Sequence, residues 1–157
     1  MHSELYWIAA SARPKLAIMA RPRAGDWLED EIAHWRREGV EIVVSLLERD
    51  EVDELGLGAE APLCEQSGIL HLSFPIPDRG IPDTADAMRF AADIAGRGRP
   101  TAIHCRAGIG RSSIMAAAVL ICDGIDPAAA LSVIQQARRL PVPDTDAQHD
   151  WVMNLGC

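Results

Sequence analysis

One stretch of the sequence combines a nucleophile with groups that bind an anion. An apolar run, Thr101–Cys105, ends in a cysteine, and a loop with Gly108 and Gly110 then leads to Arg111. Glycines let successive backbone N–H groups converge on one point, and a helix that begins after such a loop adds its positive end. Arg111 supplies a planar pair of donors that suits phosphate oxygens. The stretch therefore predicts an anion cradle with Cys105 at its floor.

The positive field of the cradle acts on the thiol as well. A cysteine at a helix N-terminus beside an arginine loses its proton more readily than an ordinary cysteine. Cys105 is therefore expected to react as a thiolate, which is the nucleophilic form. The formal charge of −8 on the whole chain does not oppose this. Exposed charges farther away than a Debye length of about 8 Å are largely screened.

Three segments resemble parts of a known enzyme family. The run from His104 through Cys105 and Arg111 to Ser112, with five residues between the cysteine and the arginine (CX5R), resembles the signature of cysteine-dependent protein tyrosine phosphatases. Residues 74–83 resemble the acid loop of small dual-specificity phosphatases, and residues 144–148 resemble their late segment, which carries a glutamine. The similarity to a small atypical dual-specificity phosphatase covers most of the chain. Residues 106–110 contain no lysine, unlike the lysine-rich loop typical of phosphoinositide phosphatases.

This resemblance implies a role for each catalytic residue. The thiolate of Cys105 would attack phosphorus and form a phosphocysteine, while Asp78 would protonate the leaving oxygen. Ser112 would help the sulfur to leave, and Gln148 would position the hydrolytic water. The expected phosphate-binding residues are Arg106, Ala107, Gly108, Ile109, Gly110 and Arg111. The resemblance implies neither a cofactor nor a metal ion.

Several of these residues have a second interpretation. Asp83 rivals Asp78 as the acid but is also a good helix cap, and Asp78 itself also suits a turn after Pro77. Ser112 suits a helix N-cap, and Gln148 also suits an exposed position on a first helical turn. His104 is more typical of a loop-orienting residue than of a metal ligand.

Further basic and cysteine residues have open roles. Arg21 and Arg23 either flank the cleft or are solvated, and Arg79 is a candidate for the pocket rim. Arg138 and Arg139 either align the loop or solvate a helix end, where cations suit the dipole. Cys64 and Cys122 are candidates for a disulfide with Cys105, although buried cysteine is the default for Cys122.

The elements that must position these residues follow an α/β pattern. Strand-like apolar runs occur at Leu5–Ala9, Leu16–Met19, Val40–Leu47, Ile69–Phe74 and Thr101–Cys105. Helical patterns alternate with the later runs, which predicts a central, mostly parallel sheet flanked by helices, with the phosphate loop between a strand and a helix. Functional loops are expected at the carboxyl ends of the strands.

Capping residues place the ends of the expected helices. Asp26 with Glu29 forms a capping-box pattern before a helix that ends near Gly39, and Glu51–Leu57 fits a short helix or turn. Later helices are expected to start near residues 83–84, after Gly110, at Asp126-Pro127 and near residues 144–145. Trp27, Trp35 and Trp151 are expected in or near the core.

Composition excludes several other classes of protein. A length of 157 residues, 48% of them hydrophobic, fits one globular domain spanning residues 1–157. The excess of 23 acidic over 15 basic residues argues against nucleic-acid binding and against an anionic membrane surface. No window approaches the roughly 18 apolar residues of a membrane span, and Met1–Glu4 do not begin a secretory signal. Four cysteines without a CxxC pair predict neither zinc nor disulfides, which favours the cytoplasm. A monomer is favoured.

The resulting hypothesis is a phosphatase that hydrolyses phosphotyrosine, and also phosphoserine or phosphothreonine, in a phosphorylated protein. A second hypothesis keeps the chemistry but takes a small phosphomonoester, such as a nucleotide, a sugar phosphate or an inositol phosphate. A third is an inactive module that binds phosphorylated residues. The presence of Cys105, Arg111 and a candidate acid favours the enzyme.

Overall fold

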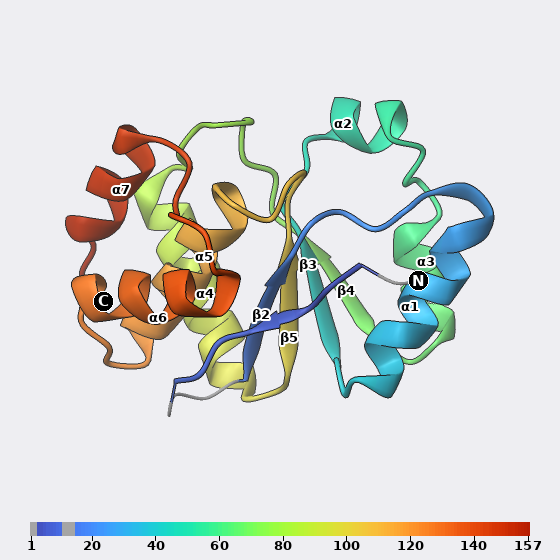
Figure 1. The fold of residues 1–157 in the computed structure, drawn as a ribbon, viewed down its shortest axis with the longest axis horizontal. Helices are drawn as coiled ribbons and strands as arrows, with labels where there is room; N and C mark the ends of the chain where they lie inside the picture. The colour runs from blue at the N-terminus through green and yellow to red at the C-terminus, as the bar shows by residue number, and fades with distance from the viewer. Residues whose placement is uncertain (1–2, 11–14) are drawn as a thin grey trace.

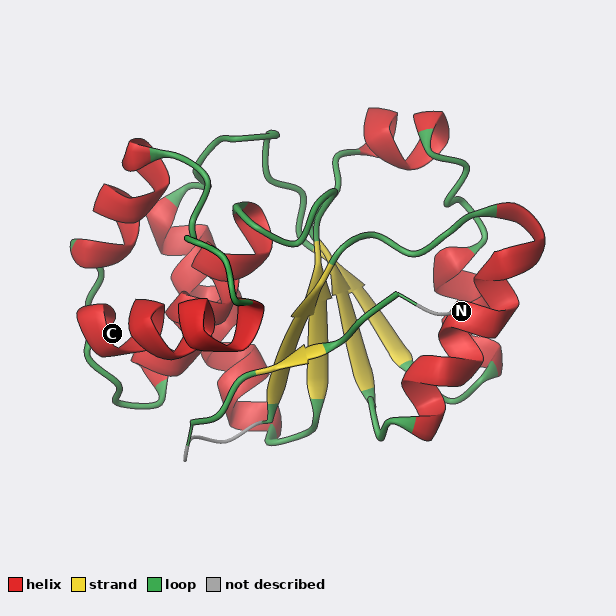
Figure 2. Ribbon diagram, in the orientation of Figure 1, coloured by secondary structure: helices red, strands yellow, loops and turns green. Residues whose placement is uncertain are grey.

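The fold is a sheet between two layers of helices. The computed structural model describes residues 3–10 and 15–157, so Met1 and His2, part of the stretch considered for a signal sequence, lie outside the described residues. Five strands lie in the order β1-β2-β5-β3-β4 (Figures 1 and 2). Their bounds are β1 Tyr6–Trp7, β2 Leu16–Met19, β3 Ile42–Ser45, β4 Leu70–Ser73 and β5 Thr101–His104. The predicted α/β class and mostly parallel sheet are confirmed.

The register of the sheet brings several functional segments to one edge. β5 runs parallel to both of its neighbours, with Thr101 opposite Leu16 of β2 and Ile42 of β3. Among the five strands of the described residues, β1 alone is antiparallel, and it pairs Tyr6 with Ile18. Because parallel strands end at the same edge, the segments that follow β2, β3, β4 and β5 emerge together, at the top of Figure 1.

Helices cover both faces of this sheet. One layer contains α4 Thr84–Arg97, α5 Arg111–Cys122, α6 Pro127–Arg138 and α7 Asp146–Met153. The other contains η1 Gly25–Trp27, α1 Leu28–Arg37 and α3 Glu60–Gln66, while α2 Arg49–Glu54 lies above the sheet edge (Figure 1). Strand residues alternate between two cores: Leu16 and Ile18 pack with the first layer, Ala17 and Met19 with the second. Strands buried on both faces explain the continuous apolar runs.

Most helix starts follow from their caps. The carboxylate of Asp126 accepts a hydrogen bond from the Ala129 N–H at 3.1 Å, and Pro127 takes the first position of α6. Thr145 and Gln148 form a capping box at the start of α7. The short helix expected near Glu51–Leu57 is α2, and it begins with a capping box between Glu48 and Glu51.

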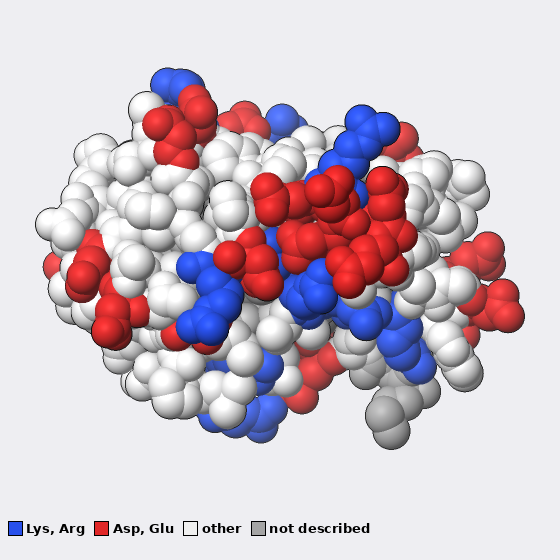
Figure 3. All heavy atoms as spheres, turned by 90° about the horizontal axis from the view of Figure 1, so that it is seen from above, with Lys and Arg blue, Asp and Glu red and all other residues white. Residues whose placement is uncertain are grey.

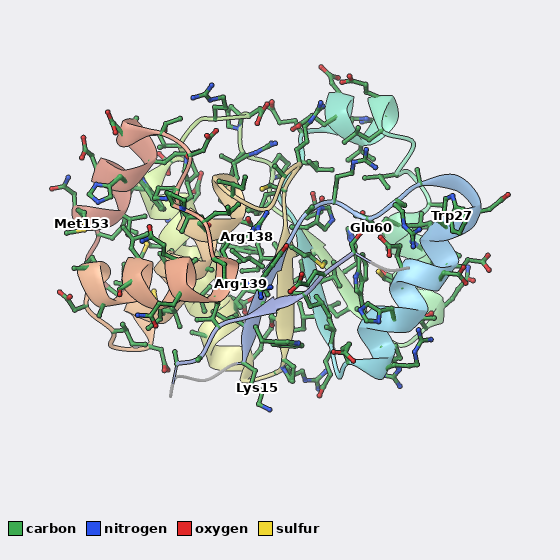
Figure 4. All side chains as sticks on the ribbon, in the orientation of Figure 1. Lys15, Trp27, Glu60, Arg138, Arg139 and Met153 are labelled. Atoms are coloured by element: carbon green, nitrogen blue, oxygen red, sulfur yellow. The ribbon has the colours of Figure 1, made fainter. Side chains whose placement is uncertain are left out.

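Three local details differ from the sequence expectations. Asp26 lies inside the short 3₁₀ helix and is not the cap of α1, because the extra turn of η1 moves that start to Leu28. α3 was not anticipated from the sequence. Trp27 is 55% exposed and not part of the core (Figure 4). The Arg23 guanidinium lies 4.8 Å from the centre of its ring and covers part of this apolar surface.

Within residues 3–10 and 15–157, no helix is both long enough and apolar enough to cross a bilayer.

Candidate active site

The predicted cradle lies between β5 and α5, at the edge where the parallel strands end. It surrounds a cavity of about 220 Å³. The loop lines it with Cys105, Arg106, Ala107, Ile109, Gly110 and Arg111, and other segments add Asp78, Arg79, Asp144 and Gln148. Residues far apart in the sequence therefore meet here. Of the predicted site residues, Gly108 and Ser112 do not line the cavity but support its wall.

Two glycines are required by the close packing of the loop. Gly108 has a φ of 70°, and a Cβ atom there would come within 2.6 Å of the backbone carbon of Met19 at the end of β2. A Cβ atom on Gly110 would lie 2.9 Å from the side-chain oxygen of Gln148. Any larger residue would push the loop away from β2 or α7 and distort the cradle.

The candidate nucleophile, Cys105, is almost fully enclosed at the floor of the cavity. The Cys105 side chain is buried, and its Sγ lies 3.4 Å from the Ser112 Oγ, in hydrogen-bond contact. A hydroxyl hydrogen can rotate, so Ser112 donates to the sulfur whenever the sulfur carries a negative charge. The N-cap of α5 is Gly110, so Ser112 is not the cap that the sequence left open.

Arg111 is the most heavily contacted side chain of the site. Its Nη1 and Nη2 donate to the two carboxylate oxygens of Glu51 at 2.6 and 3.0 Å. Nη1 also donates to the Ile76 carbonyl at 2.9 Å, and Nη2 to the Asp78 carboxylate at 3.1 Å. Burial by itself would raise the pKa of Glu51, but hydrogen bonds from Arg111 and the Glu48 N–H lower it to about 2. Glu51 is therefore an anion that fixes Arg111 from behind.

The two candidate acids lie in different surroundings. Asp78 lines the cavity and contacts Arg111, whereas Asp83 does not line it. Asp83 is the N-cap of α4, and its carboxylate accepts a hydrogen bond from the Asp86 N–H at 3.0 Å. The structure brings Asp78, and not its rival, to the cysteine and arginine.

Gln148 is buried, unlike the exposed position that the sequence left open. Its amide oxygen accepts from the Asp144 and Thr145 N–H groups, and its Nε2 donates to the Gly80 carbonyl at 3.1 Å. Gln148 thus ties the acid loop to α7 beside the cradle. An amide nitrogen has two hydrogens, so Nε2 keeps one for a molecule in the cavity.

A buried charged network lies behind the loop. His104 Nε2 is 2.7 Å from the Glu60 carboxylate, and His71 Nε2 is 3.0 Å from the same oxygen. His104 Nδ1 also lies 3.2 Å from the Cys105 carbonyl. Although burial raises the pKa of Glu60, the charge and hydrogen bond of His104 and the hydrogen bond of His71 lower it to about 2. His104 thus orients the loop, as expected, with a carboxylate to fix its ring.

Glu51 and Glu60 were missed by the sequence analysis. Both lie in short helices that carry several acidic residues, and neither follows a buried strand directly. The capping-box pair of Glu48 and Glu51 was the available signal, and it marks a helix start rather than a site.

The rim of the cavity carries paired charges. Arg79 lies 3.2 Å from Asp144, and Arg106 contacts both Glu51 and Glu54 at 3.3 Å. Figure 3, which looks down on this end of the molecule, shows acidic side chains gathered beside basic ones. Arg21 and Arg23 do not line the cavity; Arg23 pairs with Glu31 at 3.3 Å.

Neither candidate disulfide partner lies near the nucleophile. Cys64 belongs to the core on the opposite face of the sheet from Cys105. Burial raises its pKa to about 12, so it stays a thiol. Cys122 ends α5, whose first residue is Arg111, so roughly 16 Å of helix separates it from the cradle. Within the described ranges, no three His, Cys, Asp or Glu side chains are grouped to hold a metal ion.

Comparisons with known proteins find relatives in sequence and in fold. Cyclin-dependent kinase inhibitor 3 of Rattus norvegicus is 27% identical over 130 residues, which cover 80% of this chain and 61% of the relative. This chain thus spans about three fifths of that protein's length. The crystal structure of kinase-associated phosphatase, with its catalytic cysteine changed to serine, matches with a TM-score of 0.84 at 22% identity, covering 97% of this chain and 93% of that one.

Two further solved structures share the fold. A putative protein tyrosine phosphatase from Leishmania major has a TM-score of 0.75 at 20% identity over the whole of both chains. PTPMT1 in complex with PI(5)P has a TM-score of 0.68 at 20% identity, covering 88% of this chain and 87% of that one. A protein-family model for the DSP-PTPase phosphatases of polymorphic toxin systems matches residues 17–125, from β2 past the end of α5. This chain belongs to that family of dual-specificity-type phosphatases.

Proposed function

We propose that the protein hydrolyses phosphotyrosine, with phosphoserine and phosphothreonine as further substrates, through a phosphocysteine intermediate. The observation that carries the proposal is the meeting of Cys105, Arg111 and Asp78 in one cavity of about 220 Å³. A nucleophile, an anion clamp and a proton donor are the three groups that this reaction needs. We propose further that residues 1–157 make up one catalytic domain.

In the first step, the thiolate of Cys105 attacks phosphorus while the bond from phosphorus to the leaving oxygen breaks. Arg111 and the N–H groups of the loop bind the equatorial oxygens, where negative charge is concentrated. Asp78, in its protonated form, gives its proton to the leaving oxygen. The products of this step are a free alcohol or phenol and phosphocysteine.

In the second step, water attacks the phosphocysteine and passes a proton to the Asp78 carboxylate. The sulfur leaves as a thiolate, and the Ser112 hydroxyl donates a hydrogen bond to it. Phosphate is released and Asp78 is again protonated, so the cycle closes. The free Nε2 hydrogen of Gln148 is the group assigned to hold the attacking water.

The paired charges at the rim support a substrate with a single phosphate. Arg79 and Arg106, which would otherwise attract further phosphates, are held by Asp144, Glu51 and Glu54. A phosphorylated side chain of a protein fits this better than an inositol polyphosphate. A reducing compartment such as the cytoplasm belongs to the same proposal, because only the reduced thiol of Cys105 attacks phosphorus.

The test is hydrolysis of para-nitrophenyl phosphate by the purified protein. Cys105→Ser is expected to abolish turnover, while Cys157→Ser, which changes an exposed cysteine, keeps it. A chelator is expected to have no effect, and mass spectrometry of acid-quenched protein should find phosphate on Cys105. Full activity of Cys105→Ser would overturn the mechanism.

Phosphotyrosine and phosphoserine peptides, nucleotides and inositol phosphates would then define the substrate. The proposal expects the highest kcat/KM with phosphotyrosine peptides. A higher kcat/KM with an inositol phosphate or a nucleotide would replace the protein substrate with a small phosphomonoester. Binding of phosphopeptide without turnover by the unmodified protein would indicate an inactive binding module.

A further inference from the structure

Hydrogen-bond donors on the outer side of the phosphate loop bind three of its backbone carbonyls. The Arg106 carbonyl accepts a hydrogen bond from the backbone N–H of Arg21 at 3.2 Å. The next two carbonyls both face Arg138, whose Nε donates to Gly108 at 2.9 Å and whose Nη2 donates to Ala107 at 3.4 Å. Three successive carbonyls are thus received outside the cavity.

This arrangement determines where the loop N–H groups point. In a planar trans peptide, the carbonyl of one residue and the N–H of the next point in opposite directions. Carbonyls fixed outward at Ala107 and Gly108 therefore direct the N–H groups of Gly108 and Ile109 toward the inner side of the loop. The positive charge of the Arg138 guanidinium beside these carbonyls also polarises both peptide units, which makes their N–H groups stronger donors.

Arg138 is itself held in place by the N-terminal strand. Its guanidinium lies 4.2 Å from the centre of the Tyr6 ring, and Tyr6 is paired with Ile18 of β2. Arg139, the next residue, lies 6.0 Å from the same ring but forms an ion pair with Glu4 instead of reaching the loop. Figure 4 shows both arginines at the end of α6, close to β1.

We propose that Arg138 is a positioning residue for the phosphate cradle and that the Tyr6 ring holds its guanidinium in place. The inference deepens the proposed phosphatase function and rests on it. The two neighbouring arginines at the end of α6 have different roles: Arg138 shapes the anion site, whereas Arg139 forms an ion pair with Glu4 beside β1. Edge strand β1, remote from the cavity in the sequence, thereby contributes to anion binding through one stacked pair.

The proposal can be tested with four substitutions, two at the arginines and two at Tyr6. Arg138→Met removes both donors but keeps the aliphatic stem, and Arg139→Met is its matched control. Groups that orient the ligands of a metal site from outside are typically worth 10- to 100-fold, and we take the same range for donors that orient the N–H groups of an anion site. We therefore expect Arg138→Met to lower kcat/KM for para-nitrophenyl phosphate by about 10- to 100-fold, and Arg139→Met by less than about 2-fold. Tyr6→Phe, which keeps the ring face, should behave as the unmodified protein, whereas Tyr6→Leu should lose about 3- to 10-fold.

A binding measurement separates this proposal from the catalytic one. In the Cys105→Ser background, which has no nucleophilic sulfur, the affinity for inorganic phosphate is measured by calorimetry. Arg138→Met and Tyr6→Leu should weaken it by the same factors as they lower kcat/KM, with thermal unfolding showing that the protein is folded. If the affinity is unchanged in folded Arg138→Met, or falls equally in Arg139→Met, the positioning role is wrong. An inactive parent protein would contradict the phosphatase function, but this affinity difference would still test the cradle.

Discussion

Helix α2 and the acid loop, residues 74–83, both contact Arg111, but the carboxylates that they contribute differ in burial. Glu51 of α2 is 10% exposed and holds Arg111 through two hydrogen bonds. Asp78 of the acid loop is 58% exposed and holds it through one. A buried ion pair is hard to break because each charge would be left without water, whereas an exposed one is broken cheaply. The first contact therefore suits a fixed support and the second a group that must move.

The geometry of the guanidinium makes the same distinction. Glu51 occupies the edge formed by Nη1 and Nη2, whereas Asp78 contacts the Nη2 that also borders the Nε edge. A phosphate that binds through Nε and Nη2 would take the place of Asp78 and leave Glu51 undisturbed. Arrival of the substrate would then release the acid for proton transfer.

The largest effect is expected from a change of Asp78, the exposed partner of Arg111. Asp78→Asn removes the proposed proton donor, and general acid catalysis contributes about 10²- to 10⁴-fold. We expect a loss of that size in kcat for phenyl phosphate, a much smaller loss for para-nitrophenyl phosphate, and a free energy of unfolding changed by less than about 0.5 kcal/mol. Asp83→Asn, the control, should alter only helix capping. The acid assignment is wrong if Asp83→Asn shows the leaving-group dependence instead.

The second prediction concerns Glu51, the buried partner of Arg111. Glu51→Gln leaves the guanidinium of Arg111, 1% exposed, without its buried carboxylate, so the free energy of unfolding should fall by about 3 kcal/mol. Saturating phosphate should restore part of that loss, because the ligand supplies a new anion to Arg111. Denaturant unfolding with and without phosphate measures both effects. The matched control is Glu54→Gln on exposed Arg106, and equal unfolding curves for the two variants would refute the distinction.

The third prediction uses pH to test a second buried carboxylate, Glu60, which contacts His104 behind the loop as Glu51 contacts Arg111. The pKa of Glu60 is about 2 in the folded protein against 4.5 for an ordinary glutamate. Because the folded pKa is the lower one, stabilisation by Glu60 is complete above pH about 4.5 and disappears as pH falls toward about 2. The contribution is on the order of 3 kcal/mol. Urea unfolding across this range should show a shallower acid dependence in Glu60→Gln, and an unchanged slope would contradict the assignment.

The smallest expected effect concerns the rim. Asp144→Asn removes the exposed partner of Arg79, which should change the free energy of unfolding by less than about 0.5 kcal/mol. Arg79 is then available to an acidic substrate, so KM for a phosphopeptide with acidic neighbours should fall by about 2-fold at low salt. Steady-state kinetics at low and high salt measure this, and an effect that survives high salt would argue against an electrostatic cause.

Local chemistry accounts for what the sequence predicted well. A cysteine after a buried strand, two glycines and an arginine define the cradle within a few residues, and Asp126 before Pro127 marks a helix start without reference to the rest of the fold. Trp27 shows the limit of such arguments, because its burial depends on which neighbours surround it. The same limit hid α3, a short helix whose Leu63 and Cys64 pack in the core that α1 and one face of the sheet form.

The order of the residues indicated the strand-forming runs, the mostly parallel α/β class and an anion cradle with a candidate nucleophile between Cys105 and Ser112. The carboxylates that contact this cradle were identified from the folded chain: Glu51 and Asp78 reach Arg111, whereas Asp83 caps α4. Arg111 is 33 positions from Asp78 and 60 positions from Glu51, and Arg138 is 30 positions from Gly108. Contacts across such distances arise from the shared edge of parallel strands and the packing of helices on the sheet. Spacing along the chain does not reveal that packing. Asp78 and Asp83 were therefore both candidates for the acid in the sequence, although in the fold Asp78 lines the cavity and Asp83 caps α4.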